Sequence, residues 1–150
     1  MAELAPILLV EDSVDDVDLA LRAFRQSQFA NPIEVARDGV EALDYLYHRG
    51  KFGLRRPVMP AAILLDIQMP RVDGIEVLRA IKSDEHLRLI PVVMLTGAPT
   101  DPNLAKCYEL GANAYVVKPV GPVGFLEVIK AIGLFWVVVN SPAEAATEEA

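Results

Sequence analysis

Short apolar runs recur along the chain, and longer segments with helical spacing of apolar residues separate them. Each run has only four or five residues and lacks the apolar–polar alternation of a half-exposed strand. Such runs are typical of strands that are buried on both faces of a parallel sheet. The pattern predicts five strands, at residues 7–10, 33–36, 61–65, 92–95 and 114–117.

The segments between the runs carry apolar stripes at the spacing of an α-helix. Val14, Val17, Leu21 and Phe24 recur at intervals of three or four residues, and similar stripes occur near residues 40–47, 77–81, 104–110 and 125–132. A helix that follows each strand provides the crossover that neighbouring parallel strands need. We therefore predict one α/β domain with a doubly wound parallel sheet and helices on both faces.

Composition limits the classes of protein to which the chain can belong. Its 150 residues are 53% hydrophobic, which is enough for one core without a disulfide or a structural metal. A net charge of −7 argues against a nucleic-acid partner, and a single cysteine, Cys107, fits a reducing compartment. No apolar run approaches the ~20 residues of a membrane span, and no signal peptide is visible. We expect a cytoplasmic protein that binds neither nucleic acid nor membranes.

Polar side chains directly follow four of the five predicted strands. Glu11 and Asp12 follow the first strand, Asp66 the third, Thr96 the fourth and Lys118 the fifth. Sites in open α/β sheets form beyond the carboxyl ends of the strands, so these residues converge if their strands are neighbours. Each residue alone has an ordinary interpretation as a helix cap, a turn residue or a solvated charge. The complete set at four strand ends favours a functional site.

This combination of residue types suits phosphoryl chemistry. Three clustered carboxylates repel one another, and Mg²⁺, which prefers oxygen ligands, would relieve that repulsion. A carboxylate can attack phosphorus and form an acyl phosphate. An ammonium group and a hydroxyl group can stabilise charge on the peripheral oxygens of the transferred group.

Five motifs then appear in an order that resembles the receiver domain of two-component response regulators. They are Val10-Glu11-Asp12, Leu65-Asp66-Ile67-Gln68-Met69-Pro70, Asp73-Gly74, Leu95-Thr96-Gly97 and Lys118-Pro119. The resemblance covers about residues 6–135. It implies a flavodoxin-like (βα)5 fold whose five parallel strands have the order 2-1-3-4-5, and it implies that the domain acts as a phosphorylated switch.

The resemblance assigns the acceptor and the metal ligands by position. Asp66 would be the phosphorylation site. Asp12 would bind Mg²⁺ directly together with Asp66, and Glu11 would act mostly through water. The backbone carbonyl of Gln68 would be a further ligand, although the side chain at this position varies in the family.

The resemblance also assigns the residues that respond to the phosphoryl group. Thr96 would bond to it and Lys118 would pair with it, so these two and Asp66 form the expected catalytic set. Tyr115 matches the switch aromatic that moves together with Thr96. The Lys118–Pro119 peptide is expected to be cis. Residues 97–99, Gly-Ala-Pro, depart from the usual sequence of this loop.

Finer features resemble the single-domain regulators that are paired with phytochrome-type sensor histidine kinases. These features are the long connection at 49–60, the segment at 84–91 and the dipeptide Phe135-Trp136. We therefore expect a histidine kinase of that kind as the phosphoryl donor. A downstream phosphotransfer protein is a further candidate partner, and the signal would pass by changed protein contacts.

We predict that the receiver domain spans residues 1–140, with its core at 6–135. An apolar extension follows the core, and it would either pack on a second copy in a homodimer or fold back on its own chain. Its residues are Phe135, Trp136, Val137, Val138 and Val139. Residues 141–150 are small and acidic and are predicted to form a disordered tail.

Two other functions are compatible with parts of the pattern. One is a Mg²⁺-dependent phosphohydrolase with Asp66 as its nucleophile, but such enzymes place a second Asp two residues later, where this chain has Gln68. The other is a phosphate-independent pseudo-receiver scaffold, against which the complete acidic, hydroxyl and lysine set argues. The favoured prediction is a switch that is not an enzyme, apart from self-phosphorylation and slow self-dephosphorylation.

Overall fold

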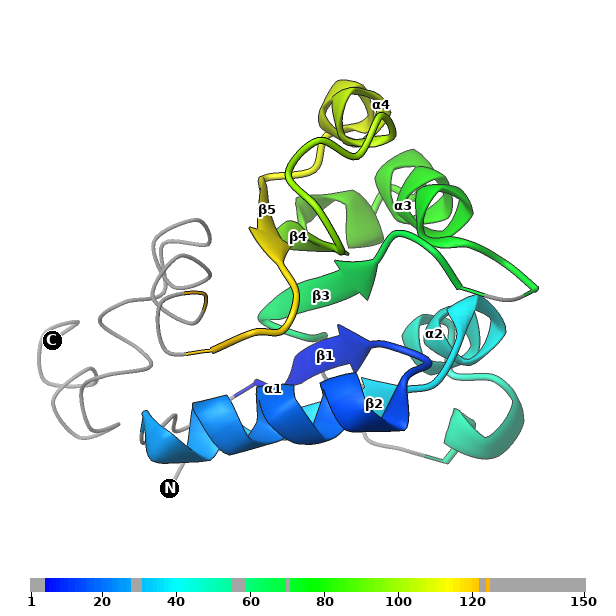
Figure 1. The fold of residues 1–150 in the computed structure, drawn as a ribbon. Coiled ribbons are helices and arrows are strands. Elements are labelled where there is room, and N and C mark those ends of the chain that lie inside the picture. Colours follow the sequence, from blue (N-terminus) through cyan, green and yellow to red (C-terminus); the bar gives the residue numbers. More distant parts are fainter. Residues whose placement is uncertain (1–4, 28–30, 55–58, 70, 122–123, 125–150) are drawn as a thin grey trace, which may run out of the picture.

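The computed structural model describes residues 5–27, 31–54, 59–69, 71–121 and 124. Strands and helices alternate along this part of the chain, as the apolar pattern predicts (Figure 1). The strands are β1 Ile7–Val10, β2 Ile33–Ala36, β3 Ala62–Asp66, β4 Val92–Thr96 and β5 Ala114–Val117. The α-helices are α1 Val14–Gln26, α2 Gly39–Leu46, α3 Gly74–Ser83 and α4 Leu104–Leu110, and two 3₁₀ helices are η1 Gly50–Phe52 and η2 Leu87–Leu89.

The five strands form one sheet in the order β2-β1-β3-β4-β5, and every neighbouring pair is parallel. This confirms the predicted order 2-1-3-4-5. The register pairs Val10 with Leu65, Asp66 with Leu95, and Thr96 with Val117. The carboxyl ends of the strands therefore lie nearly level along one edge of the sheet.

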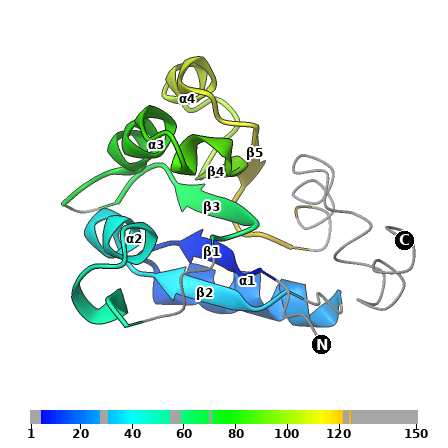
Figure 2. The same ribbon diagram turned by 180° about the vertical axis from the view of Figure 1, so that it is seen from behind.

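Two apolar clusters cover the two faces of the sheet. Inward-facing residues of α1 pack on one face, and those of α2, α3 and α4 pack on the other. Figures 1 and 2 show this arrangement from opposite sides, and it confirms the predicted helices on both faces. No helix within the described ranges is long and apolar enough to cross a membrane. The predicted helix at 125–132, the apolar extension and the acidic tail lie outside the described residues.

Side-chain caps start three helices close to the ends of strands. Ser13 accepts a hydrogen bond from the Asp16 amide at the start of α1, at 3.2 Å. Asp38 and Asp73 accept from the amides of Glu41 and Glu76, each at 2.9 Å, at the starts of α2 and α3. Each cap satisfies an amide that the helix itself leaves without a partner. The helices thus begin beside the carboxyl edge of the sheet.

Two strands are one residue longer at their carboxyl ends than the apolar pattern indicates. β3 includes Asp66 and β4 includes Thr96. The backbone pairing continues although the side chains become polar, since the amide of Ile67 donates to the carbonyl of Leu95 and the amide of Lys118 donates to the carbonyl of Thr96. Asp66 and Thr96 are therefore held by the backbone pairing of the sheet itself.

Candidate functional site

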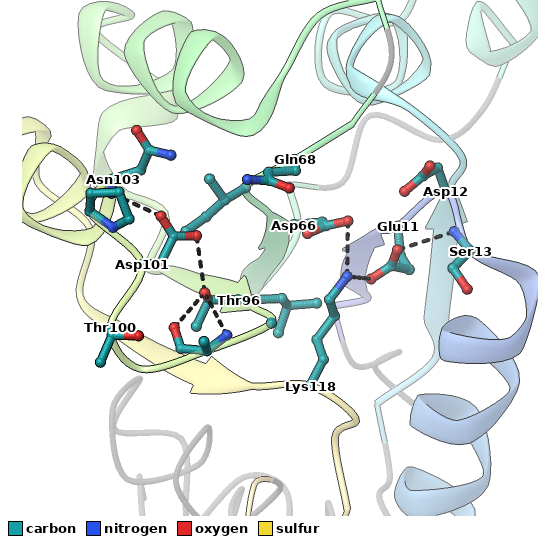
Figure 3. A pocket seen from close by; sticks show the side chains of 15 residues that line it. Glu11, Asp12, Ser13, Asp66, Gln68, Thr96, Thr100, Asp101, Asn103 and Lys118 are labelled. Carbon is teal, nitrogen blue, oxygen red and sulfur yellow. Dashed lines mark hydrogen bonds and ion pairs between the residues drawn. The ribbon is translucent and has the colours of Figure 1, made fainter.

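A cavity of about 490 Å³ opens at the carboxyl ends of β1, β3, β4 and β5 (Figure 3). It is lined by six residues that the sequence predicted for the site, namely Glu11, Asp12, Asp66, Gln68, Thr96 and Lys118. They come from four strand ends and the loops that follow. Tyr115 does not line this cavity, because its side chain is on the exposed surface of β5.

The acidic residues form one compact cluster. Carboxylate oxygens of Glu11, Asp12 and Asp66 lie within 4.8 Å of one another. Glu11 and Asp66 are buried and Asp12 is exposed, so the cluster is open to solvent on one side. Oxygen donors this close suit a hard divalent cation, and a ligand set of carboxylates with room for water is the one that Mg²⁺ prefers. The residues present therefore fit the expected metal.

Among the described residues that line the cavity, Lys118 is the positively charged one. Its Nζ lies 3.2 Å from Asp66 Oδ2, 3.2 Å from Glu11 Oε1 and 3.4 Å from Asp16 Oδ2. Burial acts to lower the pKa of Lys118, but the charges of Asp66 and Glu11 outweigh burial and raise it. Lys118 is therefore a fixed cation. Sequence reasoning missed Asp16, because an acid in the first turn of a helix is typical of any helix N-terminus.

Asp66 has an unusual acidity. Burial and the nearby charge of Glu11 raise the pKa of Asp66 to about 7, although Lys118 opposes this shift. Its carboxyl group is thus poised between the protonated and ionised forms near neutral pH. A cation bound among the carboxylates would favour the ionised form, which is the nucleophilic one.

A close approach of α3 fixes the backbone after Asp66. The amide of Gly74 donates to the carbonyl of Ile67 at 2.8 Å. A Cβ atom at Gly74 would lie 2.1 Å from the carbonyl oxygen of Asp66 and 2.8 Å from the Cα of Ile67, so only glycine fits. This contact explains the Asp73-Gly74 motif physically, since Asp73 caps the helix that Gly74 brings against the site.

Thr96 is buried, and its hydroxyl group faces the loop that follows β4 and not the acidic cluster (Figure 3). Thr96 Oγ1 donates toward the Ala98 carbonyl at 2.9 Å and toward Asp101 Oδ2 at 3.2 Å. Sequence reasoning did not identify Asp101, which lies five residues beyond the strand. The Lys118–Pro119 peptide is cis, as the resemblance predicted.

Tyr115 points outward on β5. Its side chain is 37% exposed, and its ring contacts that of Tyr108 in a T-shaped arrangement with centroids 6.5 Å apart. Among the described residues, neither Thr96 nor Tyr115 forms a hydrogen bond to the acidic cluster in this structure. The two residues lie on neighbouring strands, with Tyr115 paired to Met94 and Val117 paired to Thr96.

The family model of the response regulator receiver domain matches residues 7–130. This chain belongs to the response regulator receiver domain family. The match spans all five strands and the whole cavity, and the family acts as the signalling switch of two-component systems. This match confirms the family predicted from the five motifs. Receiver domains are partners of histidine kinases.

Several relatives are similar to this chain over most of its length. The bacteriophytochrome response regulator AtBRR is 50% identical, with a TM-score of 0.85 over 93% of this chain and 100% of that chain. Response regulator Rcp1 of Synechocystis sp. is 35% identical over 91% of this chain and 92% of its own length. A Mn²⁺-bound structure of Rcp1 has a TM-score of 0.73 at 34% identity, over 89% of this chain and 94% of that chain. The probable methanogenesis regulatory protein FilR2 of Methanothrix harundinacea is 43% identical over 93% of this chain and 88% of its own length.

Proposed function

We propose that this receiver domain accepts a phosphoryl group on Asp66 from a sensor histidine kinase and signals by a change in its protein contacts. The observation that carries the proposal is the position of Asp66. It is buried at the end of a central strand, within 4.8 Å of two other carboxylates and 3.2 Å from the ammonium group of Lys118. Glu11 shares the burial, the cluster and the contact with Lys118, but Asp66 alone of the three carboxylates is part of a strand, β3, which is the middle strand of the sheet.

The proposed transfer is a substitution at phosphorus. An ionised oxygen of Asp66 attacks the phosphorus of a phosphohistidine, a new O–P bond forms, and the P–N bond breaks. The electron pair of the broken bond returns to the imidazole nitrogen of the kinase. Lys118 faces the oxygens of the acceptor and offsets the charge that the phosphoryl group brings.

Mg²⁺ held by Glu11, Asp12, Asp66 and the Gln68 carbonyl would supply charge neutralisation at the phosphoryl oxygens. The chain's own contribution is to hold these oxygen donors on the ends of β1 and β3. The raised pKa of Asp66, about 7, implies that protons and the cation compete for the same carboxylate. Phosphorylation should therefore require both the metal and a pH that leaves Asp66 ionised.

The response to phosphorylation would pass through Thr96 and Tyr115. A phosphoryl group adds about −1.5 to −2 charges and new acceptor oxygens, which would attract the Thr96 hydroxyl inward. Tyr115 would then leave its contact with Tyr108 and fill the vacated space. Structures with and without a phosphoryl mimic test this directly, and unmoved Thr96 and Tyr115 side chains would reject the switch.

A phytochrome-type kinase is the proposed donor. The support is similarity to proteins whose names connect them with phytochromes, namely AtBRR and a phosphorylated cyanobacterial phytochrome response regulator, RcpA, at 35% identity. Autophosphorylated kinases of this and another class, mixed in turn with the chain, test it. Faster transfer from the phytochrome-type kinase is the expected outcome.

Intact-protein mass spectrometry after incubation with acetyl phosphate tests the central proposal. We expect one added phosphoryl group that requires Mg²⁺ and is absent from Asp66→Asn. The matched control is Asp18→Asn, which removes one acid from an exposed position of α1. Addition to Asp66→Asn would move the acceptor elsewhere. Turnover of a chromogenic phosphoester by the wild-type chain would instead support the phosphohydrolase alternative.

A further inference from the structure

The hydroxyl group of Thr96 already has hydrogen-bond partners on the side away from Asp66. It has a single hydrogen, which it shares between the carbonyl of Ala98 at 2.9 Å and Asp101 Oδ2 at 3.2 Å. The amide of Ala98 in turn donates to Thr96 Oγ1 at 3.3 Å. A phosphoryl oxygen on Asp66 would compete for the same hydrogen.

The second of these partners is a charged acceptor that its own loop holds in place. Asp101 Oδ1 accepts from the amide of Asn103 at 2.9 Å, and the Asp101 carbonyl accepts from the amide of Leu104. The amide of Asp101 donates to the carbonyl of Ala98. Its two carboxylate oxygens therefore have separate partners, because Oδ1 contacts the start of α4 and Oδ2 contacts Thr96.

The charge of Asp101 strengthens its interaction with the hydroxyl group. A hydrogen bond to a carboxylate is roughly twice as strong as one to a neutral acceptor such as the Ala98 carbonyl. Asp101 also lines the same cavity as Asp66 and Lys118. It therefore holds Thr96 in the outward position and adds a negative charge on the side of the cavity that faces the hydroxyl.

We propose that Asp101 is a positioning residue that retains the Thr96 hydroxyl group in the outward position and so lowers the affinity of the site for a phosphoryl group. This inference rests on the proposed function of Asp66 and deepens it. It means that a carboxylate of the loop after β4, in addition to the acidic cluster, sets how tightly the site binds a phosphoryl group. The geometry that carries it is the 3.2 Å contact between Thr96 Oγ1 and Asp101 Oδ2.

The Asp101→Asn variant separates the contact of Asp101 with Thr96 from its contact with the Asn103 amide at the start of α4. The oxygen of the asparagine amide can still accept from the Asn103 amide. Its NH₂ group can only donate to Thr96 Oγ1, so the hydroxyl hydrogen loses its charged acceptor. The probe is beryllofluoride with Mg²⁺, a phosphoryl mimic, and the titration is followed by NMR. We expect the dissociation constant of the mimic to fall about fivefold, as loss of one charge-assisted hydrogen bond allows.

Two further variants keep the result specific. Glu109→Gln removes one acid from a side chain that is 71% exposed near the end of α4, and it should leave the dissociation constant unchanged. In a Thr96→Ala background, Asp101→Asn should change the constant by less than about twofold, since the hydroxyl that Asp101 holds is gone. If Asp101→Asn fails to fold, Asp101→Ser retains a capping oxygen and takes its place.

A spectroscopic readout reports the hydroxyl itself. The Ala98 amide donates to Thr96 Oγ1, so its resonance should move toward the mimic-bound position in free Asp101→Asn. A full fivefold effect in the Thr96→Ala background would overturn the proposal, because Asp101 would then act by charge alone. An unchanged constant in Asp101→Asn would also overturn it and leave the proposed function intact. Failure of the wild-type chain to bind the mimic would instead reject the proposed function.

Discussion

Asp66, the proposed acceptor, combines reactivity with a cost to the stability of the folded chain. Asp66 is 3% exposed at the end of β3, beside the buried Glu11, and these surroundings raise the pKa of Asp66 from 3.8 to about 7. Ionised Asp66 is the form that would attack phosphorus in the proposed transfer, yet its raised pKa means that the folded protein disfavours this form. The ionised form of Asp66 is therefore destabilised by burial and by repulsion from Glu11, and a bound cation or proton would remove this repulsion.

The raised pKa of Asp66 predicts how the stability of the folded chain depends on pH. Between about pH 4 and pH 7 the folded chain holds a proton on Asp66 that the unfolded chain has released, so stability falls as pH rises through this window. We expect Asp66→Asn, which cannot ionise, to raise the free energy of unfolding by roughly 1–3 kcal/mol at about pH 8 in Mg²⁺-free buffer. The gain should fade toward pH 4.

Urea denaturation at several pH values measures this effect. Asp18→Asn is the control, since Asp18 is exposed on α1 and the stability difference from wild type should not change with pH. A gain for Asp66→Asn that is equal at about pH 5 and pH 8 would contradict the assignment of the effect to ionisation of Asp66.

Lys118 places a positive charge beside the carboxylates, which stabilises their ionised forms but opposes the binding of a cation. Its ammonium group lies 3.2 Å from two of the carboxylates that would hold Mg²⁺, so it repels the metal. We expect Lys118→Met to bind Mg²⁺ about three- to tenfold more tightly, as removal of one nearby like charge allows. Calorimetric titration measures the affinity. Lys106→Met, which removes an exposed lysine from α4, is the control, and weaker Mg²⁺ binding by Lys118→Met would reject this account.

The start of α3 packs against the backbone of Asp66 and Ile67. A Cβ atom at Gly74 would meet backbone atoms of Asp66 and Ile67. We expect Gly74→Ala to lower the free energy of unfolding by about 3 kcal/mol, because neither helix nor strand can move away freely. Its Mg²⁺ affinity should fall as well, since the clash displaces the backbone that carries Asp66.

A second glycine provides the matched comparison. A Cβ atom at Gly97 would meet nothing within 4 Å in the described part of the chain. Gly97→Ala should therefore change the free energy of unfolding by no more than about 0.5 kcal/mol. Chemical denaturation of both variants tests the pair, and equal losses would show that the close approach at Gly74 is not the cause.

Most strands and helices of the described chain could be predicted from the apolar pattern. Fully buried strands such as β1 and β4 leave continuous apolar runs, and the helix stripes identify α1 and α3. The strand order was not derivable from that pattern and came from the family resemblance. The 3₁₀ helices were also not predicted, because three residues are too few to show a period.

The residues of the site also include some that could be predicted from the sequence and some that could not. Residues that directly follow a strand, such as Asp66 and Lys118, could be predicted because the sheet determines where they lie. Asp101 and Asp16 could not, since their contacts depend on how a loop returns and which side of a helix turn faces Lys118. Acids in such positions have an ordinary interpretation as helix caps, and only coordinates distinguish the two roles.

The whole molecule includes a segment that the structure does not describe. Residues 135–139 are Phe-Trp-Val-Val-Val, an aromatic and β-branched run at the end of the predicted domain. An apolar extension of this kind is stabilised by burial against another surface. We expect the full chain to be a dimer and a chain that ends at Gly133 to be a monomer, by size-exclusion chromatography with light scattering. A dimer of the shortened chain would reject the extension as the interface.

The strand order separates the acidic cluster from the exposed terminal strand β5. Glu11 and Asp12 follow β1 and Asp66 ends β3, two strands with neighbours on both sides, whereas Tyr115 is exposed on β5, a terminal strand of the sheet. If Tyr115 carries the proposed switch, we expect substitutions at this exposed position to alter partner contacts and to leave the acidic cluster unchanged. The phosphoryl chemistry and the choice of partner would then be encoded by separate residues, so that one could be redesigned without the other.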